Sequence, residues 1–326
     1  MADPDRGGKG SADGTHGERG RAAGPFDTAG TLVAALRTGR REFERELDGL
    51  VLRNRFTVAV VFPAAGALLL VASALGLLRA EFSGLVVDLN FDPYLVLAGV
   101  AVMRLPLIAG VLPLVGRRAA AALGLLTLYA YAIEVLGVTT GIPYGGFEYL
   151  IDLGPMLGGV VPLGLPVFFF PLVLNSYLLC LLLLGDHARR ATVRLPVVVA
   201  TVVGMDLVLD PAAVALGFWA YDAGGIYYGV PFSNYAGWVV SATVAVAAFD
   251  YGFERAGLLD RLRKTAFMLD DLVSFVLLWG PINAFYGNWL PLAVAGLFGL
   301  GLLATDRFDF GVLETVPLIG RAGDRR

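Results

Sequence analysis

The chain has 326 residues, of which 57% are hydrophobic and 16% are charged, and its formal net charge is -3. This composition is too apolar for a soluble protein of that length and predicts an all-α, polytopic membrane protein. The nearly neutral charge excludes the basic surface that nucleic-acid binding requires.

Histidine and cysteine are too few for the common metal sites. The single cysteine, Cys180, excludes an intrachain disulfide, and the two histidines, His16 and His187, lie outside the apolar runs. We therefore expect no metal ion and no other cofactor at the functional site.

The N-terminal part of the chain is polar. Residues 1–28 are rich in Gly, Asp, Arg and Ser, and we interpret them as a disordered cytoplasmic tail. In residues 29–54, apolar positions such as Leu32, Leu36 and Leu47 recur at roughly helical spacing among Arg and Glu residues. This pattern predicts an amphipathic helix that lies either on the membrane surface or on the cytoplasmic face of the protein itself.

Residues 55–305 are predicted to form a helical transmembrane domain, because about eight apolar runs in this stretch are long enough to span a bilayer. The last two runs are short and are joined by a tight turn, so seven spans are the alternative. Residues 306–326 then form a cytoplasmic C-terminal tail. The expected runs are 57–78, 93–115, 119–139, 161–184, 195–219, 233–251, 268–285 and 289–305.

The charges in the connections predict the orientation. Arginine and lysine collect in alternate connections, whereas the intervening ones are nearly free of positive charge, with Arg79 as the exception. By the positive-inside rule, both termini lie on the cytoplasmic side of the cell membrane. This alternation favours eight spans, because an odd number would place the C-terminal arginines outside.

Four charged residues interrupt the apolar runs. Asp206 and Asp210 are four residues apart in the fifth run and share one helix face. Glu134 lies near the outer end of the third run, and Arg104 lies near the middle of the second. One interpretation is an ion pair of Arg104 with Asp206 or Glu134 that only holds helices together. The other is a polar pocket that opens outward, with Arg104 as its floor and the carboxylates as its walls.

Two external connections are rich in Gly, Pro and aromatic residues. They are Gly141–Pro155, after the third run, and Tyr221–Trp238, after the fifth. Tyrosine and tryptophan at this depth often serve only as interfacial anchors. Because both connections follow acid-bearing helices, we favour the interpretation that they cover a site.

Paired carboxylates in an apolar setting suit acid and base catalysis, because one can hold a proton while the other is ionised. A protonated acid can add H⁺ to an alkene, aromatic faces can stabilise the carbocation, and a second carboxylate can deprotonate the attacking water. We expect Asp206 to be the acid and Asp210, which is nearer the water, to be the base. The aromatic candidates are Tyr144, Phe147, Trp219, Tyr227 and Trp238.

Four ordered motifs suggest a family. They are EVLGVTTGIPYGGFEY (Glu134–Tyr149), LGPMLGGVVPL (Leu153–Leu163), MDLVLDP with a following GFW (Met205–Trp219), and YYGVPFSNYAGW (Tyr227–Trp238). Together they resemble the carotenoid hydratase family. The resemblance implies cofactor-independent addition of water to the terminal double bonds of an acyclic carotenoid. In the haloarchaeal members this converts bisanhydrobacterioruberin to bacterioruberin.

The resemblance also implies site positions, which we combine with the residues chosen above. The chain departs from the family pattern at Phe147–Tyr149 and in the extra Gly159 and Val160. The predicted catalytic residues are Asp206, Asp210 and Glu134. The predicted substrate-binding residues are Arg104, Tyr144, Phe147, Glu148, Tyr149, Trp219, Tyr227, Asn234 and Trp238.

Two other functions remain open. A membrane prenyltransferase would need aspartate-rich motifs that hold Mg²⁺ and a diphosphate, and the chain has only one Asp-x-x-x-Asp followed by proline. A transporter could use the same acids as a proton relay, although the two halves show no convincing repeat. The expected partners are a lipophilic carotenoid, the lipid bilayer and other membrane enzymes of carotenoid synthesis.

Overall fold

The computed structural model describes residues 25–307 and divides the chain into two compact units, residues 1–43 and 44–326. Helix α1 (Pro25–Arg53) contains the predicted amphipathic helix and begins inside the stretch that we assigned to the tail. The remainder of that tail and the C-terminal tail after residue 307 lie outside the described residues. Whether α1 lies on a membrane stays a prediction.

Seven helical segments among residues 25–307 are long and apolar enough to cross a membrane. An eighth apolar helix, α10 (Trp289–Ala304), is shorter, at 16 residues. The prediction of an all-α polytopic membrane protein is therefore confirmed. The seven segments are η1 with α2 (Thr57–Val61, Phe62–Ala74), α3 with η2 (Pro93–Val111, Leu112–Leu114), α4 (Arg117–Thr140), α5 with η3 (Leu165–Leu184, Gly185–Arg189), α6 (Ala191–Leu216), α7 (Phe232–Gly252) and η4 with α9 (Ala266–Leu269, Asp270–Phe285).

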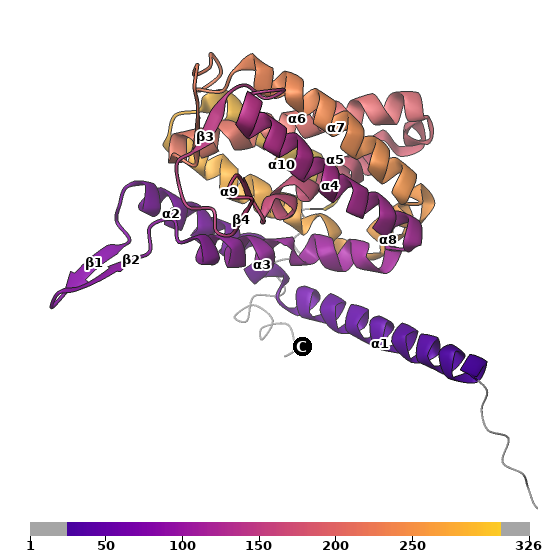
Figure 1. Cartoon of the computed structure of the whole chain (residues 1–326). Coiled ribbons are helices and arrows are strands. Elements are labelled where there is room, and N and C mark those ends of the chain that lie inside the picture. Colours follow the sequence, from indigo (N-terminus) through magenta and orange to yellow (C-terminus); the bar gives the residue numbers. More distant parts are fainter. Residues whose placement is uncertain (1–24, 308–326) are drawn as a thin grey trace, which may run out of the picture. The chain divides into compact units, whose positions relative to one another are not determined.

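Helices α4, α5, α6 and α7 pack side by side, and α9 packs against α2, α6 and α10 (Figure 1). The largest fully buried side chains of this bundle include Tyr177, Met205 and Phe249. A short helix, α8 (Arg255–Lys264), connects α7 to η4. The spans that contain α9, α5 and α6 are the most buried of the bundle, and α6 is the helix that carries Asp206 and Asp210.

Two prolines inside helices are compensated by side chains from elsewhere in the chain. A proline in a helix leaves the carbonyl four residues earlier without its hydrogen bond. Pro171 of α5 frees the carbonyl of Val167, which accepts a bond from Arg104 Nε at 3.3 Å. Pro211 of α6 frees the carbonyl of Leu207, which accepts a bond from the Tyr227 hydroxyl at 3.3 Å. Arg104 and Tyr227 thus each supply the hydrogen bond that a proline removes from a helix carbonyl.

The partner of Arg104 is a residue that the sequence analysis did not consider. The guanidinium of Arg104 lies 2.5 Å from Oδ1 of Asp271, which is in the first turn of α9. Asn175 Nδ2 donates to the other oxygen of the same carboxylate at 2.5 Å. The neighbouring Asp270 pairs with Arg55 at 2.6 Å. The alternative interpretation, in which Arg104 pairs with Asp206 or Glu134, is therefore wrong, because α9 supplies the carboxylate that pairs with Arg104 of α3.

Within residues 25–307, three short antiparallel pairs of strands lie in the connections, and none of them was predicted from the sequence. Strands β1 (Arg79–Phe82) and β2 (Leu85–Asp88) form a hairpin between α2 and α3. Strands β4 (Met156–Leu157) and β5 (Val161–Pro162) form a smaller hairpin before α5. Strand β3 (Phe147–Tyr149), which follows α4, pairs with β6 (Trp219–Tyr221), which follows α6. This last pair joins the two connections that we expected to cover a site.

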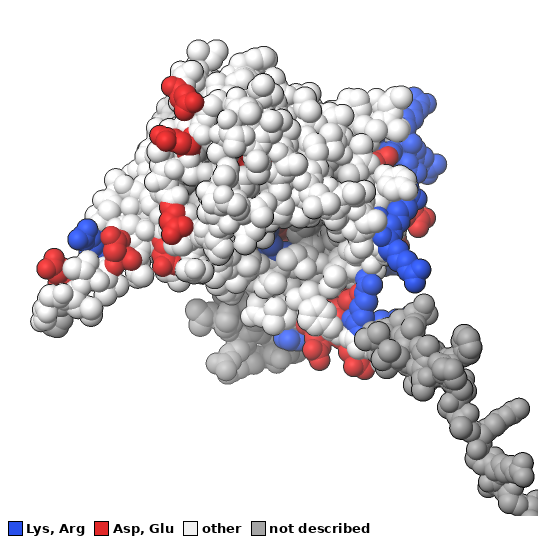
Figure 2. All heavy atoms as spheres, viewed as in Figure 1, with Lys and Arg blue, Asp and Glu red and all other residues white. Residues whose placement is uncertain are grey.

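The charged side chains separate between the two ends of the bundle. Figure 2 shows Lys and Arg gathered on one side of the transmembrane unit, and mostly Asp and Glu on the other. The basic side includes the exposed Arg117 and Arg118 at the start of α4 and Lys264 at the end of α8. Strand β3 and its connection lie at the opposite end of α4 (Figure 1).

Candidate functional site

A two-stranded ribbon of β3 and β6 covers one end of the bundle. Helices α4 and α6 each end at a glycine in the left-handed conformation, Gly141 at φ 75° and Gly217 at φ 79°, which turns the chain toward the ribbon. Alternate residues of a strand share a face, so the paired residues Phe147–Tyr221 and Tyr149–Trp219 all point into the protein. Their rings are in contact, with centroids 5.9 and 6.5 Å apart within each pair.

Under the ribbon, Asp206 and Asp210 are bridged by one amide. The Asn234 Nδ2 atom, in the first turn of α7, donates to Asp206 Oδ2 at 3.0 Å and to Asp210 Oδ2 at 2.7 Å. All three residues are buried. The predicted shared face of the two acids is confirmed, and no cation among the described residues pairs with either of them.

Asp210 receives a second donor from the ribbon. The Tyr221 hydroxyl donates to Asp210 Oδ2 at 2.8 Å. Burial raises the pKa of Tyr221 well above its ordinary value, so the phenol stays protonated and keeps donating. Both donors, Asn234 and Tyr221, therefore reach the same carboxylate oxygen, Oδ2.

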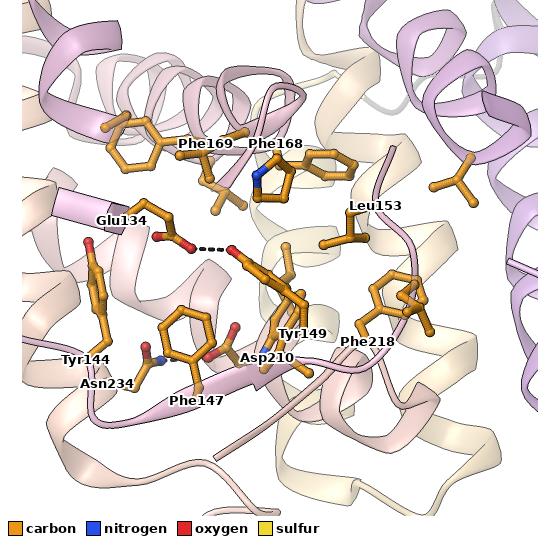
Figure 3. Close-up of a pocket in the computed structure, with 18 of the residues that line it drawn as sticks. Glu134, Tyr144, Phe147, Tyr149, Leu153, Phe168, Phe169, Asp210, Phe218 and Asn234 are labelled. Carbon is orange, nitrogen blue, oxygen red and sulfur yellow. Dashed lines mark hydrogen bonds between the residues drawn. The ribbon is translucent and has the colours of Figure 1, made fainter. Parts of the chain in front are cut away.

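Glu134, on α4, receives the other tyrosine of the ribbon. The Tyr149 hydroxyl donates to Glu134 Oε1, as the dashed line in Figure 3 shows. Burial raises the pKa of Tyr149 as well, so this phenol also stays protonated. Glu134 and Asp210 are thus each held by one phenol from the ribbon, whereas Asp152, the third acid of the cavity that they line, is exposed and accepts a bond from the Gly154 N–H.

Glu134 and Asp210 line one cavity, with a volume of about 160 Å³. The rest of its wall is mostly apolar and aromatic. In Figure 3, Tyr144, Asn234 and Glu134 lie on one side, whereas Leu153 and Phe218 lie on the other. Further lining residues include Pro93, Leu97, Leu165, Phe168, Phe169, Leu172, Trp219, Trp238 and Trp279.

Tyr144 is fixed by two helix glycines. A Cβ atom at Gly237 would lie 2.5 Å from one edge of its ring, and a Cβ atom at Gly137 would lie 2.9 Å from the other, so only glycine leaves room for the ring. The Tyr144 hydroxyl lies 2.6 Å from Ser241 Oγ, which lies 3.1 Å from the Tyr129 hydroxyl. This chain of hydroxyls runs from the cavity into the α4–α7 interface.

The structure brings most of the predicted site residues together around this cavity and leaves four outside it. Arg104 pairs with Asp271, and Tyr227 binds the Leu207 carbonyl, so neither lines the cavity. Glu148 points to the outer face of the ribbon and is exposed, because its strand neighbours point inward. Asp206 is fully buried behind Asp210 and does not line the cavity. The predicted residues that line it are Glu134, Tyr144, Phe147, Tyr149, Asp210, Trp219, Asn234 and Trp238.

Tyr221, whose hydroxyl donates to the catalytic candidate Asp210, was not predicted from the sequence. Its only local signal was its position at the start of an aromatic connection, and its alternation with Trp219 was hidden in a strand of three residues. Phe169 and Trp279 were also missed, because they lie in ordinary apolar runs. Among residues 25–307, no group of three His, Cys, Asp or Glu residues is arranged to hold a metal ion.

Comparison with known proteins places the chain in a family. The sequence profile described as carotenoid biosynthesis protein matches residues 91–302, which include every residue of the cavity. Over 277 residues the chain is 62% identical to a protein named bisanhydrobacterioruberin hydratase from Haloarcula japonica, a match that covers 85% of this chain and 91% of that protein. No solved structure matches the chain. The chain therefore belongs to the family of carotenoid biosynthesis proteins.

Proposed function

We propose that this protein is a hydratase that adds water to the terminal carbon–carbon double bonds of an acyclic carotenoid, converting bisanhydrobacterioruberin to bacterioruberin. The relative named for that activity, at 62% identity, supports the substrate. The observation that carries the chemistry is the pair of carboxyl groups, Glu134 and Asp210, in one apolar cavity. Hydration needs a proton donor and a proton acceptor beside a hydrocarbon, and this cavity offers both.

In the first step, Glu134 donates its proton to the less substituted carbon of the terminal alkene. Glu134 receives a single hydrogen bond, from Tyr149, in apolar surroundings, which favour the neutral acid over the carboxylate. The π electrons of the alkene form the new C–H bond, and the positive charge falls on the tertiary carbon.

The carbocation then lies among aromatic faces. Phe147, Trp219 and Trp238 line the cavity, and the electron-rich face of an aromatic ring attracts a cation. The ribbon over the cavity also limits the access of water, so that the cation meets one oriented water molecule.

In the second step, the oxygen of that water attacks the tertiary carbon, and Asp210 takes the proton that the water loses. Asp210 is the better base, because donors from Asn234 and Tyr221 stabilise its negative charge. The sum of the two steps is the addition of one water, with no cofactor consumed. Glu134 regains a proton, and Asp210 loses one, before the next turnover.

Asp206 acts through Asp210 in this mechanism. It is fully buried, shares the Asn234 amide with Asp210 and does not line the cavity, so it has no direct path to the alkene. This replaces the expectation that Asp206 is the acid. A neutral Asp206 avoids two adjacent negative charges, and it leaves Asp210 as the ionised partner.

The orientation belongs to the same proposal. Figure 2 shows a basic end of the bundle, which we assign to the cytoplasmic side by the positive-inside rule. In this proposal both termini are cytoplasmic, and the end of the bundle that the ribbon covers faces outward. We expect association with other membrane enzymes that make and elongate the carotenoid.

The test is to express the protein in cells that make the candidate substrate and to analyse carotenoids by chromatography and mass spectrometry. We expect products heavier by one or two waters from the wild type, and none from Glu134→Gln or Asp210→Asn. A wild type without water gain would refute the function, and full activity in both variants would refute the mechanism. Activity of the purified protein in a metal chelator separates this reaction from that of a magnesium-dependent prenyltransferase.

A further inference from the structure

The cavity is too small for a whole carotenoid. Its volume is about 160 Å³, and an apolar cavity of about 150 Å³ holds one benzene molecule. Only the terminal few carbon atoms of a long polyene fit beside Glu134 and Asp210. The rest of the substrate must therefore pass through a wall of the cavity.

The candidate walls differ in what lies behind them. The ribbon separates the cavity from the aqueous end of the bundle, and Phe169 stacks on Trp238 with ring centroids 5.7 Å apart on the inner side. A third wall consists of the start of α3 and the segment 151–165, which contains the β4–β5 hairpin. Leu157 and Leu163 of this segment are exposed, so this wall borders the surface of the protein.

One leucine closes this wall. A Cβ atom at Gly164 would lie 2.8 Å from Leu97 Cδ2, and a Cβ atom at Gly154 would lie 3.5 Å from Leu97 Cδ1 and from Pro93 Cβ. Leu97 itself lines the cavity. The side chain of Leu97 thus fills the gap between α3 and the segment 151–165.

The β4–β5 hairpin, which lies next to Leu97 in this wall, is held by few polar contacts. The Tyr131 hydroxyl of α4 donates to the Leu163 carbonyl at 2.7 Å. The turn residues Gly158 and Gly159 have φ values of 59° and 73°, and nothing lies within 4 Å of a Cβ atom at either. Leu157 and Leu163 on this hairpin are exposed. Exposed leucines on a helical membrane protein suit contact with lipid chains or with a polyene.

We propose that Leu97, between Gly154 and Gly164, forms a lateral portal through which the end of the polyene enters from the bilayer. The body of the substrate, an extended hydrocarbon, then lies outside on an apolar surface formed by Leu95, Leu157 and Leu163, all of which are exposed. This inference rests on the proposed function, since it takes a long hydrocarbon as the substrate.

The experiment locks the portal with a disulfide. In a Cys180→Ser background, which removes the single native cysteine, the pair Leu97→Cys and Gly164→Cys is introduced, and the protein is assayed in vesicles that contain the carotenoid. We expect the reduced protein to hydrate the substrate and the oxidised protein to be at least about tenfold slower, with recovery after reduction. Equal rates in the oxidised and reduced forms would overturn the portal.

Two further disulfide pairs make the result specific. Glu81→Cys with Val86→Cys locks the remote β1–β2 hairpin, where the two residues are paired, and oxidation there should not change the rate. Glu148→Cys with Ala220→Cys locks the ribbon. A loss of hydration on locking the ribbon, with normal hydration on locking the Leu97 pair, would place the entrance under the ribbon and refute the proposal.

A variant without a disulfide covers the case in which the Leu97 pair does not crosslink. Leu97→Trp enlarges the side chain between Gly154 and Gly164 and should raise the KM at least about tenfold, whereas Leu85→Trp, at an exposed leucine of the remote β1–β2 hairpin, should keep the wild-type KM. Wild-type KM in a folded Leu97→Trp protein would refute the portal. Absence of water gain in the wild type and in Leu85→Trp, by contrast, would refute the hydratase function itself.

Discussion

Two groups of carboxylates within the helices of this protein differ in their partners. At the start of α9, Asp271 pairs with Arg104 at 2.5 Å, and Asp270 pairs with Arg55 at 2.6 Å. Below the ribbon, Glu134 and Asp210 are held only by neutral donors. A buried ion pair keeps both charges and holds helices together, whereas a buried acid without a cation is free to exchange its proton. We infer that the first group stabilises the bundle and that the second carries the chemistry.

The largest expected effect is on catalysis by the cavity acids. Asp210→Asn and Glu134→Gln should each lower the hydration rate by about 10²- to 10⁴-fold, because each removes one proton-transfer group and keeps the shape of the side chain. Thermal unfolding of the purified variants should occur near the wild-type temperature. Substantial activity in either variant would break the distinction between the two groups.

The second largest effect is expected on the stability of the protein, when the ion pair of Asp271 at the start of α9 is broken. Asp271→Asn leaves the buried guanidinium of Arg104 without its counter-ion, and such a loss costs about 3–5 kcal/mol of unfolding free energy. The melting temperature should fall, while the rate per folded molecule should stay near that of the wild type. The double variant Arg104→Met with Asp271→Leu should recover part of the loss, since it removes both charges but leaves the Val167 carbonyl and the Asn175 amide without these partners. Failure of this rescue would show that the pair does more than hold α3 to α9.

A smaller effect is expected at Tyr221, which the sequence analysis missed. Tyr221→Phe removes one hydrogen bond to Asp210, so the hydration rate should fall about tenfold, equivalent to about 1.4 kcal/mol. A positioning role predicts a fall in kcat with little change in KM. Tyr227→Phe is the matched control, because its hydroxyl binds a backbone carbonyl outside the cavity. Equal losses of kcat in the two variants would argue against a role for Tyr221 in tuning Asp210.

The smallest effect is expected at Glu148, which lies between two cavity residues in the chain. Glu148→Gln should leave the hydration rate within about twofold of the wild type, because surface substitutions away from the site have small effects. The same assay should show that Phe147→Ala and Tyr149→Phe reduce the rate. Loss of activity in Glu148→Gln would mean that the ribbon presents its other face to the substrate.

The sequence predicted the features that depend on local spacing. The lengths of the apolar runs gave the spans, with α10 shorter than expected, and the four-residue interval between Asp206 and Asp210 placed both acids against one amide. These predictions succeeded because helix periodicity and bilayer thickness constrain residues that are close together in the sequence.

Features that depend on distant partners were not predictable in this way. Arg104 and Asp271 are 167 positions apart, and nothing in either run indicates the other. Strands β3 and β6 are three residues each, too short to show an alternating pattern, so the inward face that joins Tyr149 and Tyr221 was hidden. The proline at position 211 gave a usable signal, since it required a donor for Leu207, but it did not indicate that Tyr227 supplies it.

The most direct test of this account compares one acid from each group in a single assay. Purified Asp210→Asn and Asp271→Asn are placed in lipid vesicles with the carotenoid, and the hydration rate per folded molecule is measured together with the melting temperature. The account predicts that Asp210→Asn is folded and nearly inactive, while Asp271→Asn melts earlier and is active per folded molecule. The reverse pattern, an active Asp210→Asn with a stable but inactive Asp271→Asn, would contradict it.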